Sequence, residues 1–104
     1  MKSKIEKIVN ATAVMIMFTG QLDLKDSREL SKLMDVEKLE RDVVVFDLTK
    51  AIYISSSVLG QMVAIRSKLN SVNLREPIIV GCNEQIFNLF ELTGVAHFFK
   101  FVNA

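Results

Sequence analysis

Three consecutive serines, Ser55, Ser56 and Ser57, are the residues of this chain whose position best suits them to chemistry. They follow two apolar stretches, at residues 43–46 and 52–54, and directly precede a helical pattern. A serine at the start of a helix caps it, because its side-chain oxygen accepts a hydrogen bond from a free N–H group of the first turn. The same helix end carries a partial positive charge that suits a phosphate group. One cap needs a single serine, so the run is consistent with a structural cap or with a phosphate-bearing site.

The other candidate reactive residues are few and isolated. His97 is the only histidine, and no pattern of cysteine or acidic residues around it suggests a metal site or a triad, so we expect a loop or packing role. Cys82 is the only cysteine, and we expect a small buried residue rather than a nucleophile. Asp23 and Asp47 lie near predicted strand ends, where an acid is either solvated or part of a site. The sequence shows no catalytic pair, metal site or cofactor motif and predicts a protein that is not an enzyme.

Length and composition predict one soluble domain that spans residues 1–104. The hydrophobic share of 50% is enough for a core, and the formal net charge of +1 argues against a nucleic-acid-binding protein, which would show a basic stripe. The charged amino terminus lacks the apolar core of a signal peptide, and no apolar run approaches the roughly 20 residues of a membrane span. We therefore expect a cytoplasmic protein without direct membrane insertion.

The apolar pattern predicts the elements that position the serines. The β-branched run at residues 43–46 is typical of a strand buried on both faces, and we expect the central strand of a sheet at residues 43–48. Apolar residues at helical spacing from Val58 to Leu69 predict a helix over residues 57–70. The serines are then expected in the loop between this strand and this helix, where open α/β sheets place their sites.

The other expected elements complete the order β-β-α-β-α-β-α-β. Asp26 and Glu29 have the spacing of a capping box, which predicts a helix over residues 27–37 after a loop at residues 20–24. Asn83 is expected to cap the last helix. Four methionines are expected in the core: Met15, Met17, Met34 and Met62. Further strands are expected at residues 5–9, 13–18 and 78–80, and a last strand or packed tail at residues 98–102.

Strands that alternate with helices in this way imply right-handed crossovers between neighbouring parallel strands. The predicted fold class is therefore α/β, with helices packed against a mixed, mostly parallel sheet of about four to five strands. The carboxyl end of the central strand is the predicted place of the site.

Three segments of the chain resemble the STAS domain family, which includes bacterial anti-sigma factor antagonists and the cytoplasmic part of sulfate transporters. Residues 20–30 begin with G-Q-L-D-L and resemble the family's G-E-L-D-L segment and the helix start after it. Residues 45–60 resemble its V-D-L-S strand and D-S-S-G-L-G loop, and residues 90–99 resemble its L-E-L-T-G-L ending. Together the segments cover most of the chain in the family's order and spacing, and the resemblance implies a STAS fold.

The resemblance implies that Ser57 is phosphorylated, with Ser56 as the alternative, because the family's acceptor is the second serine of its D-S-S-G segment. Ser55 stands where the family usually has aspartate, which removes a carboxylate near the acceptor. Val58 stands where the family usually has glycine and adds a β-branched side chain. The partner-binding residues implied by the resemblance are Asp23, Ser55, Ser56, Ser57, Val58 and Leu59.

For the function, the resemblance implies a protein-interaction switch that binds an anti-sigma factor, itself a serine kinase, or another regulatory protein. An alternative is a STAS subunit or scaffold of a signalling or lipid-transport complex that is not phosphorylated. A third and weaker hypothesis is a domain that binds a small molecule or nucleotide with the same loop. The sequence does not predict the oligomeric state.

Overall fold

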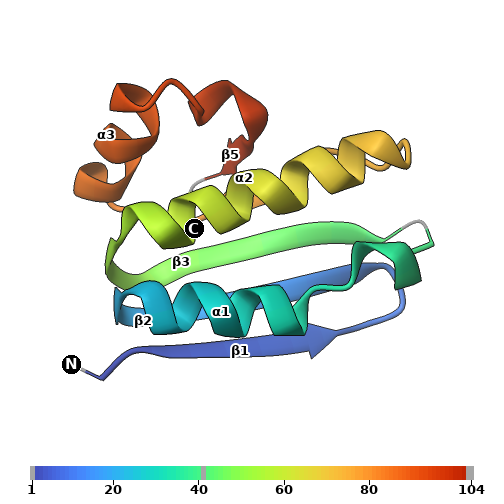
Figure 1. Cartoon of the computed structure of the whole chain (residues 1–104), viewed down its shortest axis with the longest axis horizontal. Helices are drawn as coiled ribbons and strands as arrows, with labels where there is room; N and C mark the ends of the chain where they lie inside the picture. The colour runs from blue at the N-terminus through green and yellow to red at the C-terminus, as the bar shows by residue number, and fades with distance from the viewer. Residues whose placement is uncertain (1, 41, 103–104) are drawn as a thin grey trace.

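β3 (Val43–Ile54) is the central strand of a five-stranded sheet with the order β1-β2-β3-β4-β5 in a computed structural model that describes residues 2–40 and 42–102 (Figure 1). β1 is antiparallel to β2, and the other neighbouring strands are parallel. The other elements are β1 (Lys4–Val9), β2 (Ala13–Leu22), α1 (Leu24–Leu33), a 3-10 helix η1 (Val36–Lys38), α2 (Ser56–Ser71), β4 (Ile78–Val80), α3 (Glu84–Leu92), a 3-10 helix η2 (Ala96–Phe98) and β5 (Lys100–Val102). The predicted α/β fold with a mixed, mostly parallel sheet is confirmed.

The helices cover one face of the sheet, and α1 and α2 pack against each other along it (Figure 1). Residues of β2 and of the first half of β3 therefore alternate between buried and half-buried positions, and Ile16 and Phe46 on the covered face are completely buried. Val43 and Val45 face the other side and are only half-buried, so the expectation of a strand buried on both faces is wrong. The two faces of β3 differ because the helices lie on one side of the sheet: Val44 and Phe46 point towards them and are buried, whereas Val43 and Val45 point away.

The methionines divide between the two faces of the sheet in the same way. Met34 and Met62 lie in the core, as expected. Met15 and Met17 are half-buried on the uncovered face of β2, so their assignment to the core is wrong. Neighbouring residues of a strand point to opposite faces, and the alternate positions Val14, Ile16 and Phe18 fill the core instead.

α1 begins earlier than the sequence predicted. Residues 20–22 belong to β2 rather than to a loop, and Asp23 is the N-cap instead of Asp26. Asp26 forms the other half of the capping box, since its side chain accepts a hydrogen bond from the Asp23 N–H at 2.9 Å. Asp26 also accepts from the Ser3 hydroxyl at 3.1 Å, which joins the start of β1 to the start of α1. Glu29 is exposed and plays no part in the cap.

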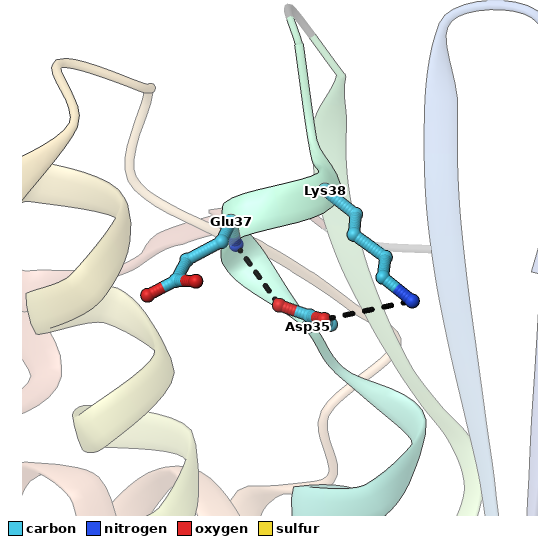
Figure 2. A network of polar contacts seen from close by, with 3 residues as sticks. All are labelled: Asp35, Glu37 and Lys38. Carbon is cyan, nitrogen blue, oxygen red and sulfur yellow. Dashed lines mark hydrogen bonds and ion pairs between the residues drawn. The ribbon is translucent and has the colours of Figure 1, made fainter.

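α1 also ends earlier, at Leu33 rather than near residue 37. The backbone of Met34 is extended, and Asp35 begins the short helix η1 by accepting a hydrogen bond from the Glu37 N–H at 3.2 Å (Figure 2). Lys38 lies 3.8 Å from the other carboxylate oxygen of Asp35, in an exposed ion pair that contributes little to stability (Figure 2). A side chain that caps a new turn thus competes with continuation of the preceding helix.

The second half of the chain follows the predicted pattern closely. The apolar stripe of α2 is buried at every expected position: Val58, Met62, Ile65 and Leu69. Asn83 caps α3, and Gly94 follows that helix with φ +75°, the left-handed conformation that favours glycine. The expected last strand is shorter than predicted, because Phe98 belongs to η2 and only Lys100–Val102 pair with β4. Among the described residues, no helix has both the length and the apolarity of a membrane span.

Candidate functional site

Three helices begin at one edge of the sheet, where the parallel strands β2, β3 and β4 end (Figure 1). Their N-cap residues are Asp23, Ser55 and Asn83. The Ser55 N–H donates to the carbonyl of Leu22 at 2.9 Å, which fixes the start of α2 beside the residue that precedes Asp23. This edge therefore brings together the predicted site residues of two segments that are far apart in the sequence.

Ser55 and Ser57 form a hydroxyl pair at the start of α2. Their Oγ atoms lie 2.7 Å apart, and either hydroxyl can be the donor. Ser55 Oγ also accepts from the Val58 N–H at 3.3 Å, so Ser55 is the N-cap. Ser56 and Ser57 lie in the first turn of the helix and not in the expected loop. The start of α2 was otherwise predicted within one residue.

The three serines differ in their access to solvent. Ser56 is exposed, whereas Ser55 and Ser57 are half-buried. Val58 and Leu59 are core residues with exposed fractions of 0% and 5%, so their side chains are not part of the surface at this edge. Val58 has regular helical backbone, since Asn73 alone among the described non-glycine residues has positive φ. The valine in place of glycine therefore anchors the start of α2 in the core without backbone strain.

Two irregularities of β3 shape the surface beside the serines. The pairing of β2 with β3 shifts between Met17 and Thr19 and again between Gly20 and Gln21, so β3 contains extra residues there. Such bulges interrupt the alternation of a strand and often lie next to binding sites. As a consequence Ile52 and Tyr53 are 43% and 41% exposed. The sequence reasoning missed this surface because it treated residues 52–54 as one apolar patch.

A third exposed apolar residue, Leu24, lies at the first position of α1 and is 53% exposed. Gln21 pairs with Tyr53 in the sheet, so the end of β2, the start of α1 and the end of β3 are neighbours. The side chain of Asn83 donates to the carbonyls of Ala51 and Ile52, at 3.2 and 3.1 Å, and fixes the start of α3 to the same segment. Asp23 itself is exposed, and its carboxylate accepts from the Lys25 N–H at 3.0 Å.

Among the described residues, the others singled out in the sequence make no hydrogen bond to the serines. Cys82 is half-buried, and burial raises the pKa of its thiol from 9.0 to about 11. His97 is exposed and lies against Phe98, with ring centroids 4.2 Å apart and the ring planes inclined at 48°. Asp47 accepts from the Thr49 N–H at 2.9 Å within β3. Within residues 2–40 and 42–102, no three His, Cys, Asp or Glu side chains are placed to hold a metal ion.

The fold and this edge define a class of small α/β domains in which a serine-bearing helix start faces solvent at the carboxyl end of the central strand. The sequence model of the family described as STAS domain matches residues 4–104, and the chain belongs to this family. The resemblance stated from the sequence is thus confirmed.

Individual relatives agree with this assignment. The anti-sigma-B factor antagonist of Listeria monocytogenes is 26% identical over 89 residues, which cover 85% of this chain and 77% of the relative. A putative anti-sigma factor antagonist of Thermotoga maritima has a similar structure, with a TM-score of 0.81 and 18% identity over 96% of this chain and 86% of that chain. The anti-sigma factor antagonist SpoIIAA in its unphosphorylated form gives a TM-score of 0.72 and 16% identity over 99% and 89%. At these identities the two structures show the shared fold alone.

Proposed function

We propose that this chain is an anti-sigma factor antagonist: it binds an anti-sigma factor that is also a serine kinase, and phosphorylation of Ser57 controls that binding. The observation that carries the proposal is the edge at which Ser55, Ser56 and Ser57 lie beside three exposed apolar side chains, Leu24, Ile52 and Tyr53. The names of the Listeria relative and of SpoIIAA support the antagonist function, and SpoIIAA has structures in an unphosphorylated and in a phosphorylated form.

The proposed contact surface consists of Asp23, Leu24, Ile52, Tyr53, Ser55, Ser56 and Ser57. It combines exposed apolar and aromatic side chains, the kind that form the buried core of protein interfaces, with hydroxyl groups and one carboxylate. Val58 and Leu59 are buried and support this surface from the core. A phosphate on Ser57 adds a charge of about −1.5 to −2 at the centre of the surface, which disfavours contact with an apolar or acidic partner surface.

The experiment begins with capture of the partner from an extract of the native cells on the immobilised wild-type chain. The captured proteins are identified by mass spectrometry, and the chain is then incubated with the captured kinase and ATP. We expect phosphate on Ser57 in the wild type and in Ser56→Ala, and none in Ser57→Ala. We expect Ser57→Asp to bind the partner more weakly than Ser57→Ala, because a fixed negative charge enters a desolvated contact.

A control separates the apolar surface from the switch. Tyr53→Ala removes an exposed side chain of the proposed surface, so it should weaken partner binding without changing the phosphate position. Leu92→Ala is the matched control, since Leu92 on α3 is 86% exposed and lies outside the proposed surface. Equal binding of Tyr53→Ala and Leu92→Ala would contradict the proposed surface, and unmodified serines would contradict the switch.

One observation favours a second function, in which the chain is a STAS subunit of a larger complex without phosphorylation. Ser57 is half-buried, and its hydroxyl is held by Ser55 at 2.7 Å, so its oxygen is less available to a kinase than that of the exposed Ser56. In this case Ser57→Asp and Ser57→Ala should bind the captured partner equally, and no phosphate should appear on Ser55, Ser56 or Ser57. The same experiment therefore distinguishes the two functions.

A further inference from the structure

Within the part of the chain that the structure describes, β1 is a free edge of the sheet, because it pairs with β2 on one side and ends the strand order on the other. The edge is six residues long, and Ile8 and Val9 are 48% and 61% exposed. The Asn10 N–H donates to the Ala13 carbonyl at 3.0 Å and so marks a hydrogen-bonded pair at the hairpin. Hydrogen-bonded and non-hydrogen-bonded pairs alternate along antiparallel strands, so Ile5 and Lys7 belong to non-hydrogen-bonded pairs with β2. Their backbone N–H and C=O groups therefore point away from β2. Such unpaired groups are a template for another strand.

Two copies of β1 related by a two-fold axis have few possible antiparallel registers, because a residue must meet its own equivalent at the axis. With Glu6 at the axis, two carboxylates lie opposite each other, and with Lys7 at the axis, two ammonium groups do. Like charges directly opposite are destabilising. With Ile5 at the axis, an apolar pair forms there, and Lys4 of each copy lies opposite Glu6 of the other. With Lys4 at the axis two ammonium groups again meet, and with Ile8 or Val9 at the axis the charged residues lie opposite uncharged ones. The Ile5 register is thus the only one of these in which opposite charges lie opposite each other.

Within one chain Lys4 and Glu6 already form an ion pair, with Lys4 Nζ 3.2 Å from Glu6 Oε1. Both side chains are well exposed, at 62% and 49%, so this ion pair contributes little to stability. Each side chain can therefore pair with a residue of another copy instead. In the selected register the same two residues make two ion pairs between the copies, one on each side of Ile5. The side chains of Lys4 and Glu6 lie on the uncovered face of the sheet, since they pair with Thr19 and Met17 of β2.

A hollow at the same edge supports this register. It has a volume of about 260 Å³ and is lined by Ser3, Lys4, Ile5, Lys25, Asp26 and Glu29. In the selected register Lys7 of the second copy lies opposite Ser3, on the side of the sheet that α1 covers. Its ammonium group then enters the hollow beside Glu29, which is exposed. Asp26 is 4% exposed and already accepts from Ser3 and from Asp23, so Glu29 is the carboxylate that remains for Lys7.

We propose that the partner of the β1 edge is a second copy of this chain, in a two-fold dimer with Ile5 at the axis, Lys4 opposite Glu6 and Lys7 beside Glu29. The dimer joins two five-stranded sheets into one and removes the free edge of β1. It does not depend on the proposed function, because its contacts are made by β1 and Glu29 and not by the serines. The two proposals therefore fail separately.

The test is the mass of the wild-type chain by sedimentation velocity from about 1 to about 500 µM, a range that covers weak to moderate dissociation constants. We expect a dimer at the upper end. Glu6→Lys should weaken self-association by about tenfold or more. Lys4 of each copy then lies opposite a second positive charge, at position 6 of the other copy. The double variant Lys4→Glu with Glu6→Lys restores opposite charges in the same register and should dimerise again. Glu91→Lys, an exposed reversal on α3, is the matched control and should dimerise like the wild type.

The register is tested separately by cysteine substitution in the Cys82→Ser background. Ile5→Cys places two thiols at the axis and should form a disulfide-linked dimer on mild oxidation, whereas Glu6→Cys and Lys7→Cys should link far less. Preferential linking through position 6 or 7 would overturn the proposed register. A chain that stays monomeric over the whole range, or a dimer that is indifferent to Glu6→Lys and therefore uses another surface such as the uncovered face of the sheet, would overturn the proposal.

Discussion

The hydroxyl oxygens of Ser55 and Ser57 lie 2.7 Å apart, so the residue that caps α2 is also the hydrogen-bond partner of the proposed phosphate acceptor. In the STAS pattern an aspartate usually stands at the position of Ser55, and both side chains can cap a helix. The hydroxyl differs because it can donate as well as accept, whereas a carboxylate only accepts. Ser55 thus holds Ser57 without placing a negative charge beside it.

Replacement of Ser55 by alanine measures this cap. Ser55→Ala removes the acceptor of the Val58 N–H and should lower the free energy of unfolding by about 1 kcal/mol. Ser56→Ala is the matched control and should change it by less than about 0.5 kcal/mol, because Ser56 is exposed and does not cap the helix. Urea denaturation followed by circular dichroism measures both. Equal effects of the two substitutions would show that the Ser55 side chain does not act as the cap.

Burial of the α2 stripe predicts a larger loss. Ile65→Ala should lower the free energy of unfolding by roughly 2 to 5 kcal/mol, since the side chain is 2% exposed in the core and its removal leaves a cavity. Ser67→Ala on the exposed side of the same helix should change it by less than about 0.5 kcal/mol. Gln61 on the same helix is half-buried and is therefore a poorer control. Similar unfolding midpoints for Ile65→Ala and Ser67→Ala would contradict the packing of α2.

The order and faces of the helices could be predicted because apolar spacing reports directly which side of a helix is buried. The stripe from Val58 to Leu69 needed no knowledge of the rest of the chain. The start of α1 was different, because Asp23 and Asp26 both have the residue type of an N-cap. Asp23 is the N-cap, while Asp26 accepts a hydrogen bond from Ser3, which is 23 positions away. The spacing of neighbouring residues in the sequence does not reveal such a distant contact.

The surface of the candidate site was predicted only in part. The serine positions followed from the pattern and the family resemblance, but Ile52 and Tyr53 are exposed by shifts in the pairing of β3 with β2. Those shifts depend on the relative lengths of the two strands, which the sequence does not show. The one sequence feature that indicates them, weakly, is the polar pair Thr49 and Lys50 inside an apolar strand. The uncovered face of the sheet could not be predicted either. Its position depends on where the helices pack, and the composition of the strands does not reveal that.

Two glycines should respond in opposite directions to the same substitution. Gly60 lies on α2, and a Cβ there meets no atom within 4 Å, so Gly60→Ala should stabilise the chain by up to about 1 kcal/mol through helix propensity. Gly81 has φ +72°, and a Cβ there would collide with the side chain of Thr49. Gly81→Ala should destabilise by more than about 1 kcal/mol, because the left-handed conformation alone costs an L-residue roughly 1–2 kcal/mol. Thermal and urea unfolding should place the two variants on opposite sides of the wild type.

The thiol of Cys82 should react slowly in the folded chain. Burial raises its pKa from 9.0 to about 11, so the reactive thiolate is about 100-fold rarer at about pH 8 than in an unfolded chain. Alkylation by iodoacetamide, followed by intact mass, should therefore be about two orders of magnitude slower without urea than in denaturing urea. The rate in the folded chain should keep rising with pH towards about 11, whereas the rate in the unfolded chain should level off above its pKa of 9.0. Cys82→Ser gives the background.

The same shift of the Cys82 pKa has a consequence for stability. The folded chain holds the thiol proton more tightly than the unfolded chain, so between pH 9.0 and about 11 the unfolded state binds fewer protons. The free energy of unfolding should then fall as the pH rises through this window, and below it the contribution of Cys82 should be constant. Cys82→Ser, compared with the wild type by urea denaturation at several pH values, isolates this contribution, because serine does not titrate there. Two results together would contradict this prediction: parallel pH dependences of the two chains and rapid alkylation of the folded wild type. They would show that the thiol is not desolvated and that the start of α3 is more open to solvent than in the structure.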